Sequence, residues 1–141
     1  WQILDIGCGY GAIGIAIARA YPTTKVTMTD INKRAVKLTR MNIKLNRIEN
    51  AKTTDSDLYN KLKGKKFNTI ITNPPQSAGK EVCFKIIKQA HLHLKNKGLL
   101  QLVARHNKGG KSLSKKMEEV FNNVKPTAKK GGYRVYVSEK D

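Results

Sequence analysis

The chain has 141 residues and a mass of 15.8 kDa, which is enough for one domain with one hydrophobic core. Its hydrophobic content of 39%, together with 11 glycines, is typical of globular proteins and excludes an intrinsically disordered chain. A net charge of +18 favours a polyanionic partner such as RNA, with a lysine-rich solubilising surface as the alternative.

The cysteines and the apolar runs indicate the cellular location of the protein. Cys8 and Cys83 are far apart and match no metal-binding or redox spacing, so we expect reduced thiols, no metal and a cytoplasmic protein. The longest apolar run, Ala12–Ala18, is too short to span a bilayer, and no signal peptide is visible. The chain opens at Trp1 within an apolar stretch, without an initiator methionine, and we expect that a preceding segment is missing.

Strand-like and helix-like patterns alternate along the first part of the chain. They predict a strand at Ile3–Ile6, a helix at Ala12–Tyr21, a strand at Lys25–Thr29, a helix at Asn32–Asn46 and a weak strand at Ala51–Thr53. The second helix carries apolar residues on roughly one side, namely Ala35, Leu38, Met41 and Leu45.

The alternation continues to the end of the chain. Strands are predicted at Phe67–Thr72 and Leu99–Ala104. A helix between them, ending at Gly98, is predicted by apolar residues at helical spacing: Val82, Ile86, Ile87, Ala90 and Leu94. A further helix is predicted by Leu113, Met117, Val120 and Phe121. Val124–Thr127 and Tyr133–Val137, which flank two glycines, predict a closing β-hairpin.

This pattern predicts a single doubly wound, Rossmann-like α/β domain over residues 1–141. Its seven-stranded sheet should be mostly parallel, with an antiparallel C-terminal hairpin. Ligands of such folds bind beyond the carboxyl ends of the strands, where the strand order reverses. We therefore expect functional residues directly after the strands.

The stretch LDIGCGYGAIG follows the first strand and opens the first helix. Gly7, Gly9 and Gly11 would allow a tight turn and a close approach to a ligand, although small residues also serve helix–sheet packing. Gly9, Gly11 and Gly14 match the dinucleotide fingerprint, which alone does not separate NAD from S-adenosylmethionine. Asp5 favours S-adenosylmethionine, because a carboxylate would oppose a pyrophosphate and suits an ammonium and a sulfonium.

Two further acids follow strands. Asp30 lies about 20 residues after Gly11, the offset at which an acid binds ribose hydroxyls. It could instead cap the next helix, although Asn32 is also available for that role. Asp57 is placed to accept a hydrogen bond from an adenine amine, and Asp55 is the alternative. The simpler interpretation is that either acid only forms a turn.

The stretch TNPP ends the fourth strand. An exocyclic amine is planar because its lone pair is delocalised. The Asn73 amide oxygen and the Pro74 carbonyl oxygen could accept hydrogen bonds from its two N–H groups and hold the nitrogen in line with a methyl group. Proline would fix the carbonyl, since its ring fixes φ. The simpler interpretation is a strand end followed by a turn.

The motifs DIGCGYG, TD, SDLY and TNPP, in this order, resemble those of class I methyltransferases that modify exocyclic amines. The longer stretches ITNPPQSAGKEV and GGYRVY resemble the methyltransferase small domain branch. Its best-known members are guanine-N2 methyltransferases of small-subunit ribosomal RNA and their archaeal relatives. The resemblance covers essentially the whole chain and implies S-adenosylmethionine as the cofactor.

The resemblance also implies site residues. Cofactor-binding positions would be Asp5, Gly7, Cys8, Gly9, Gly11, Asp30, Ile31, Asp57, Leu58 and Asn73. Catalytic positions would be Asn73, Pro74, Pro75 and Gln76, with Asn73 holding the target amine. Gln76 departs from the family pattern, which usually places Tyr or Phe there to stack on the target base. The family's segment before the first strand, which helps to cover the cofactor, is also absent.

Other residues could contribute to a site. His91 and His93 would face different sides of a helix and make a poor metal pair. His106 follows the fifth strand and could contact substrate, and Tyr10 could pack over the cofactor. A basic cluster after that strand could bind phosphates or form a solvated face: Arg105, Lys108, Lys111, Lys115 and Lys116. Tyr133 and Arg134 in the hairpin could contact RNA or protect the sheet edge.

The sequence therefore predicts an S-adenosylmethionine-dependent methyltransferase that acts on an exocyclic amine in RNA. The expected target is guanine N2 of ribosomal RNA, and the expected partner is ribosomal RNA or the ribosomal subunit. Three alternatives stay open: a protein-glutamine amide methyltransferase, an NAD-dependent oxidoreductase and a non-catalytic RNA-binding module.

Overall fold

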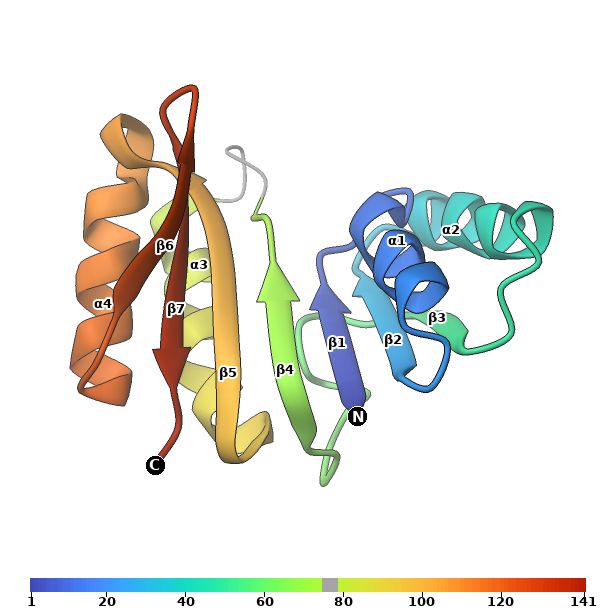
Figure 1. Cartoon of the computed structure of the whole chain (residues 1–141), viewed down its shortest axis with the longest axis horizontal. Coiled ribbons are helices and arrows are strands. Elements are labelled where there is room, and N and C mark those ends of the chain that lie inside the picture. The colour runs from blue at the N-terminus through green and yellow to red at the C-terminus, as the bar shows by residue number, and fades with distance from the viewer. Residues whose placement is uncertain (75–78) are drawn as a thin grey trace.

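The computed structural model describes residues 1–74 and 79–141, apart from the side chains of Asn107 and Lys108. Within this part, the chain forms one seven-stranded sheet in the order β3-β2-β1-β4-β5-β7-β6 (Figure 1). The strands are β1 (Gln2–Ile6), β2 (Lys25–Asp30), β3 (Ala51–Asp55), β4 (Phe67–Thr72), β5 (Leu94–Arg105), β6 (Lys125–Lys130) and β7 (Tyr133–Glu139). Strands β1 to β5 are parallel, and β7 runs antiparallel to β5 and β6. The predicted sheet is confirmed.

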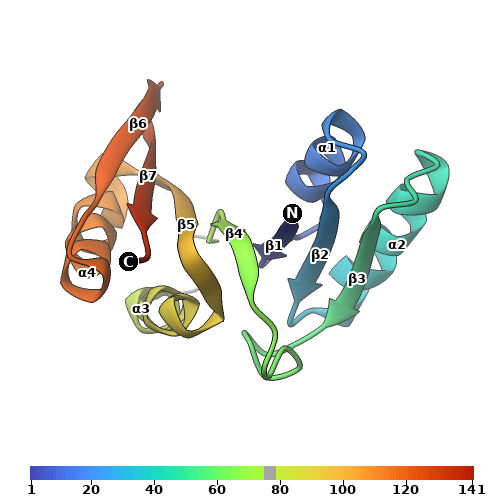
Figure 2. The same ribbon diagram turned by 60° about the horizontal axis from the view of Figure 1, so that its bottom comes forward.

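Helices cover both faces of the sheet, as a doubly wound fold requires (Figures 1 and 2). On one face, α1 (Ala12–Ala20) and α2 (Lys33–Leu45) pack over β1, β2 and β3. On the other, α3 (Gly79–Ala90) and α4 (Lys111–Phe121) pack near β5 and β7. Two short helical turns, η2 (His91–His93) and η3 (His106–Gly110), follow α3 and β5. No helix in the described ranges is long and apolar enough to cross a membrane.

Each face of the sheet has its own hydrophobic core. The larger core, on the side of α3 and α4, includes Leu4, Ile70, Ile87, Leu100, Leu102 and Met117. The smaller core, under α1 and α2, consists of Ile3, Ile15, Ala18, Val26 and Met28. Successive residues of one strand point to opposite faces, so a strand covered on both faces carries apolar residues that point in both directions. This explains why neighbouring apolar residues marked β1 and β4 in the sequence, although both strands also contain polar residues.

The predicted helix end at Gly98 is wrong. Helix α3 ends at Ala90, and Leu94 already begins β5, in which Gly98 lies. A Cβ at Gly98 would lie 2.8 Å from the Lys95 carbonyl oxygen and 3.0 Å from that of Asn68. The glycine is therefore needed for close packing of β5 on β4, next to an irregularity in their pairing, and does not cap a helix.

The second helix is confirmed, but the apolar residues on its one side do not face the core. Leu38, Met41 and Leu45 are exposed, and Leu45 as a residue is 77% accessible to solvent. The residues of α2 that are buried are Val36 and Thr39. Thr39 contacts the loop between β1 and α1. A polar residue is therefore buried on α2, whereas a hydrophobicity pattern predicts that the buried residues are apolar.

The strand order reverses between β1 and β4, which are parallel neighbours. The chain leaves β1 toward α1 on one face and reaches α3 from β4 on the other. The segments that follow β1 and β4 therefore separate at this edge, which is where α/β sheets form ligand-binding crevices.

Gly14 permits the close approach of α1 to β2. A Cβ at this position would lie 2.3 Å from the Met28 sulfur and 3.2 Å from the Asp5 carboxylate. We predict that Gly14→Ala destabilises the fold, because overpacking costs about 1–3 kcal/mol and exceeds the gain in helix propensity of up to about 1 kcal/mol. Urea denaturation should show a smaller loss in a Met28→Ala background, and equal losses in both backgrounds would contradict this packing role.

Candidate active site

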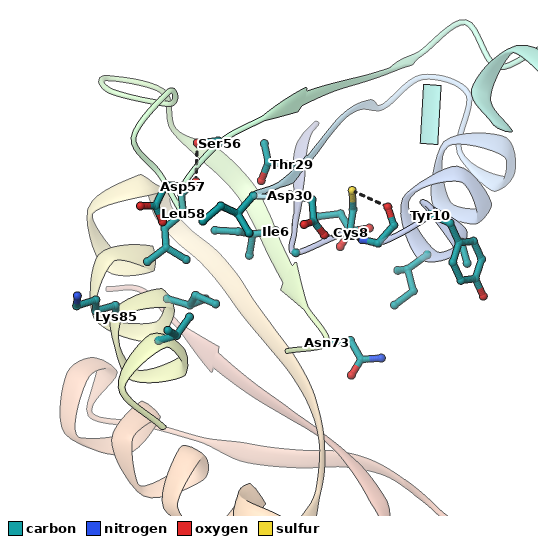
Figure 3. A pocket seen from close by; sticks show the side chains of 18 residues that line it. Ile6, Cys8, Tyr10, Thr29, Asp30, Ser56, Asp57, Leu58, Asn73 and Lys85 are labelled. Atoms are coloured by element: carbon teal, nitrogen blue, oxygen red, sulfur yellow. Dashed lines mark hydrogen bonds between the residues drawn. The ribbon is translucent and has the colours of Figure 1, made fainter. Parts of the chain in front are cut away.

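A cavity of about 770 Å³ lies at the carboxyl ends of β1, β2 and β4, where the strand order reverses (Figure 3). This volume is typical of a small-molecule or cofactor site. Its wall includes nine of the residues predicted from the sequence: Asp5, Gly7, Cys8, Gly9, Asp30, Ile31, Asp57, Leu58 and Asn73. We name it the first cavity.

The loop after β1 is held from several directions. The backbone N–H groups of Gly7 and Cys8 both donate to the Thr29 carbonyl oxygen, at 2.8 and 2.9 Å. The Thr39 hydroxyl donates to the Gly9 carbonyl oxygen at 2.7 Å. Gly7 and Gly9 have φ values of 73° and 59°, and a Cβ at either would meet nothing within 4 Å. The constraint on these two glycines is therefore conformational, and the space beside them belongs to the cavity.

Gly11 does not line the first cavity, unlike the other glycines predicted to bind cofactor. Its φ is 92°, and a Cβ would lie 2.8 Å from the Thr39 side chain. Gly11 therefore packs against Thr39 of α2, which differs from the helix–sheet packing considered from the sequence, and its role toward the cofactor stays a prediction.

Asp5 is a buried carboxylate in the wall of the first cavity, and only 2% of the residue is exposed. Its Oδ2 accepts a hydrogen bond from the Gly14 N–H at 3.2 Å. Burial raises the pKa of Asp5 to about 6, and the nearby charge of Asp30 adds to this effect although the Gly14 N–H opposes it. A cationic group in the cavity would stabilise the ionised form of this carboxylate.

Asp30 connects β2 to the loop after β1 and to the start of α2. Its Oδ2 accepts from the Gly9 N–H at 3.0 Å, and its Oδ1 accepts from the Asn32 N–H at 2.9 Å. Asn32 is the N-cap of α2, because its side chain accepts from the N–H groups of Arg34 and Ala35. The alternative in which Asp30 caps the helix is therefore wrong. Each carboxylate oxygen keeps a further lone pair for a ligand hydroxyl.

The two acids after β3 have different surroundings. Asp55 lies 3.1 Å from the Lys61 ammonium, whose hydrogen bond lowers the pKa of that carboxyl, and it does not line the cavity. Asp57 is exposed and lines the cavity. The turn that places it is held by Ser56, whose hydroxyl donates to the Leu58 carbonyl oxygen at 2.8 Å. This geometry agrees with the choice of Asp57, whose role toward adenine stays a prediction.

Cys8 lines the cavity but is a poor nucleophile. Burial raises the pKa of its thiol to about 11, although its contact with Thr39 at 3.7 Å opposes this shift. The reactive form of cysteine is the thiolate, so the neutral Cys8 does not indicate covalent catalysis.

Asn73 lies exposed at the end of β4, apart from Asp30 and Asp57 (Figure 3). Among residues 1–74 and 79–141, no side chain or backbone group is hydrogen-bonded to its amide. It lines the first cavity and also a neighbouring cavity of about 760 Å³, the second cavity, which Pro74 lines as well. Pro75 and Gln76, two predicted catalytic positions, lie outside the described residues.

Sequence reasoning missed much of the apolar wall of the first cavity. The missed residues are Ile6, Ala12, Ile13, Thr29, Ser56, Val82, Lys85 and Ile86. Val82 and Ile86 lie on the apolar side of α3. In the sequence, these two residues predicted a helix but gave no indication of a binding site. The Thr29 hydroxyl is buried beside the cavity and has no hydrogen-bond partner within the described part of the chain. Tyr10, suggested as a cofactor cover, does line the cavity.

The histidines lie outside both cavities. His91 packs against Phe121, and the His93 ring stacks on Tyr59 at 4.6 Å. The His106 ring is hydrogen-bonded to the Tyr136 hydroxyl, and desolvation together with nearby Arg134 lowers its pKa. The described residues contain no group of three side chains able to hold a metal ion.

The fold and the acid-lined cavity define a Rossmann-like domain with a nucleoside-sized site. Residues 1–137 match the family described as the methyltransferase small domain, and the chain belongs to this family. Its cofactor is S-adenosylmethionine. The site fits that cofactor, since it combines the buried Asp5 carboxylate and the Asp30 carboxylate with apolar walls and with the Thr29 hydroxyl, which has no partner among the described residues.

Several proteins are similar to the chain. It is 40% identical over 139 residues to the uncharacterized protein YbxB of Bacillus subtilis (strain 168), covering 98% of this chain and 69% of that one. It is 33% identical over 139 residues to ribosomal RNA small subunit methyltransferase C of Haemophilus influenzae (strain PittEE), covering 96% of this chain but 41% of that enzyme. A shorter match, 49% over 75 residues, is to the release factor glutamine methyltransferase of Fusobacterium nucleatum subsp. nucleatum, covering 52% of this chain and 21% of that one.

Among solved structures, the chain is similar to a T. thermophilus 16S rRNA N2 G1207 methyltransferase (RsmC) in complex with AdoMet and guanosine. The TM-score is 0.85 with 26% sequence identity, and the match covers 99% of this chain and 37% of that one. The chain thus spans less than half of the ribosomal RNA methyltransferases to which it is similar.

The raised pKa of Asp5 predicts a pH-dependent stability. The folded protein holds the Asp5 proton more tightly than the unfolded chain, so this contribution to the free energy of unfolding is present at low pH and lost as pH rises through about 6. The difference between 3.8 and about 6 corresponds to roughly 3 kcal/mol. Asp5→Asn should remove this loss, so the variant should gain stability relative to the wild type between about pH 4 and pH 7.5.

Urea denaturation of both proteins at several pH values measures this difference. Asp55→Asn is the control of opposite sign, because Asp55 lies outside the cavity and Lys61 lowers its pKa, so its removal should give no gain in stability as pH rises. A stability difference between wild type and Asp5→Asn that stays constant over this pH range would show that Asp5 is not held protonated by its burial.

Proposed function

We propose that the protein is an S-adenosylmethionine-dependent methyltransferase that acts on guanine N2 in ribosomal RNA. The observation that carries this proposal is the position of Asn73, which lines both cavities and leaves its amide without a partner among the described residues. An acceptor at the boundary of two cavities can hold an amine in one toward a methyl group in the other.

The charge of the first cavity supports S-adenosylmethionine over NAD. Three carboxylates line it, namely Asp5, Asp30 and Asp57, and Lys85 is the basic residue in its wall. These acids would repel a pyrophosphate and attract an ammonium and a sulfonium. Asp30 would accept from ribose hydroxyls, and Asp5 would balance the positive charge of the ligand. When bound, S-adenosylmethionine supplies an electrophilic methyl group.

The residues at the end of β4 would position the target. The Asn73 amide oxygen and the Pro74 carbonyl oxygen accept hydrogen bonds from the two N–H groups of the amine. These hydrogen bonds keep the amine nitrogen directed toward the first cavity. No strong base is required for this role, since orientation of the reacting groups supplies much of the rate enhancement. A guanine inside a duplex would have to be flipped out or already unpaired to reach this position.

The charge of the chain and its relatives support RNA as the substrate. A net charge of +18 favours phosphate contacts, and all six residues of β6, KPTAKK, are exposed. The names of the Haemophilus and T. thermophilus proteins specify ribosomal RNA, and the latter also specifies guanine N2. The match to a release factor glutamine methyltransferase supports a second candidate, because a glutamine amide presents the same planar nitrogen.

Transfer of labelled methyl groups tests the choice between these substrates. Small ribosomal subunits, free ribosomal RNA and a release factor are offered in parallel to the purified protein. We expect label in RNA, on the guanine amine after digestion to nucleosides. Label in the release factor alone would replace the proposal with glutamine methylation.

Removing the Asn73 amide should separate cofactor binding from catalysis. We predict that Asn73→Ala leaves the Kd for S-adenosylhomocysteine nearly unchanged and lowers methyl transfer roughly 100-fold or more, because the amine loses its orientation. Calorimetry and labelled transfer measure the two effects. Asn68→Ala, at the opposite end of β4, is the matched control, and retained turnover in Asn73→Ala would remove Asn73 from the mechanism.

Removing the Asp30 carboxylate should instead weaken cofactor binding. We predict that Asp30→Ala costs about 1–3 kcal/mol in binding of S-adenosylhomocysteine, the typical penalty for lost charged hydrogen bonds. Asp30→Asn keeps one of the two acceptor oxygens that the Gly9 and Asn32 N–H groups use, and it should lose less. Asp55→Ala should leave the Kd unchanged, and an equally unchanged Kd for Asp30→Ala would restrict Asp30 to a structural role.

A further inference from the structure

The second cavity contains an arginine with an unusual environment. Arg105, the last residue of β5, lines this cavity together with Asn73, Lys80 and Tyr133. Its Nε is buried and has no hydrogen-bond partner, and no ion pair involves its guanidinium, within the described part of the chain. Its Cζ lies 4.9 Å from the centre of the Tyr133 ring, within cation–π distance.

The two cavities on either side of Asn73 differ in charge. Three carboxylates line the first, whereas the described lining of the second contains Lys80 and Arg105 and no carboxylate. A partly buried guanidinium without an acceptor is unfavourable, because its lost hydration is not replaced. A ligand that presents hydrogen-bond acceptors to the second cavity would remove this penalty.

Strand pairing places Arg105 at a useful distance from Asn73. Thr72 of β4 pairs with Leu102 of β5, so Arg105 lies two residues farther along its strand than Asn73. This offset is about 7 Å along the strands, and neighbouring strands are about 5 Å apart. Arg105 also pairs with Tyr133 of β7, a residue that is 43% exposed. The separation is on the scale of a purine ring system.

We propose that the second cavity binds the target guanine and that Arg105 reads its acceptor edge, the O6 and N7 atoms, while Asn73 holds the N2 amine. This inference rests on the proposed methylation of a guanine amine. Arginine donates to these two acceptors in its commonest specific contact with bases, whereas adenine presents an amine where guanine has O6. Tyr133 is a positioning residue, because its ring holds the guanidinium by cation–π contact.

Nucleoside binding in the presence of saturating S-adenosylhomocysteine tests this proposal. Guanosine and 2,6-diaminopurine riboside both carry the 2-amine, but the second has an amine in place of O6. The wild type should bind guanosine at least about fivefold more tightly, the lower end of the discrimination expected from a bidentate arginine contact. Calorimetry or NMR titration measures both affinities, and no binding of guanosine at millimolar concentration would overturn the proposal.

Variants of Arg105 and Tyr133 identify which side chain is responsible for the preference for guanosine over 2,6-diaminopurine riboside. Arg105→Ala and Arg105→Lys should both reduce the ratio of the two affinities to near one, because lysine keeps the charge but loses the planar fork. Tyr133→Phe should keep the ratio and Tyr133→Ala should lower it. Arg40→Ala, which removes an arginine of α2 outside both cavities, is the matched control. An unchanged ratio in Arg105→Ala overturns the proposal.

Guanosine monophosphate distinguishes a phosphate contact from base recognition. If Arg105→Ala removes only the extra affinity of the monophosphate and keeps the base ratio, Arg105 binds phosphate and the proposal fails. This failure is separate from failure of the proposed function. Labelled methyl transfer to RNA guanine by the wild type would still support the function, and methyl transfer to a release factor alone would contradict it.

Discussion

The carboxylate of Asp30 is the contact on which the geometry of the first cavity depends. One of its oxygens accepts from the loop after β1, and the other accepts from the residue that caps α2. The same loop is held by Thr39 of α2 and by the carbonyl of Thr29 in β2. Two elements, β2 and α2, therefore fix the loop from the protein side. Its glycines Gly7 and Gly9 leave the opposite side free for a ligand.

This arrangement comes at a cost in stability. Asp5 is buried without a cationic partner in the described residues, and its pKa is raised accordingly. A neutral side chain would stabilise the fold at neutral pH, but it would not balance the charge of an S-adenosylmethionine ligand. Conflict between local stability and ligand recognition is typical of functional sites. Arg105 shows the same conflict with the opposite charge.

The opposite charges of the two cavities suit two different ligands. The first cavity carries acids for a cationic nucleoside, and the second carries a lysine and an arginine for a partner rich in acceptors. Asn73 contributes to both, because β4 ends where the segments that follow β1 and β4 separate. The topological reversal of the sheet therefore determines where the proposed transfer of a methyl group takes place.

Much of the fold was predictable from local signals. The buried strands carry short apolar stretches, and the acids and glycines of the first cavity lie at or just after the ends of strands, at short, recognisable spacings. The face of α2 and the role of Gly98 were not predictable in this way. Thr39 is buried because it donates to the Gly9 carbonyl, 30 residues away, and Gly98 is constrained by the carbonyl of Asn68 on a neighbouring strand. Such long-range contacts leave no periodic signal.

The second cavity was only partly visible in the sequence for a related reason. Arg105 and Tyr133 were considered separately, and their pairing across β5 and β7 exists only in the folded sheet. The buried Nε of Arg105 likewise depends on packing that composition does not reveal. Spacing along the chain therefore located the proposed cofactor site better than the proposed substrate site.

A crystal structure of the protein with S-adenosylhomocysteine and guanosine tests the central claim most directly. The account predicts the cofactor sulfur in the first cavity, directed toward Asn73, and the guanine in the second cavity with its 2-amine on the Asn73 amide oxygen. A cofactor bound elsewhere, or an Asn73 side chain that contacts neither ligand, would contradict it.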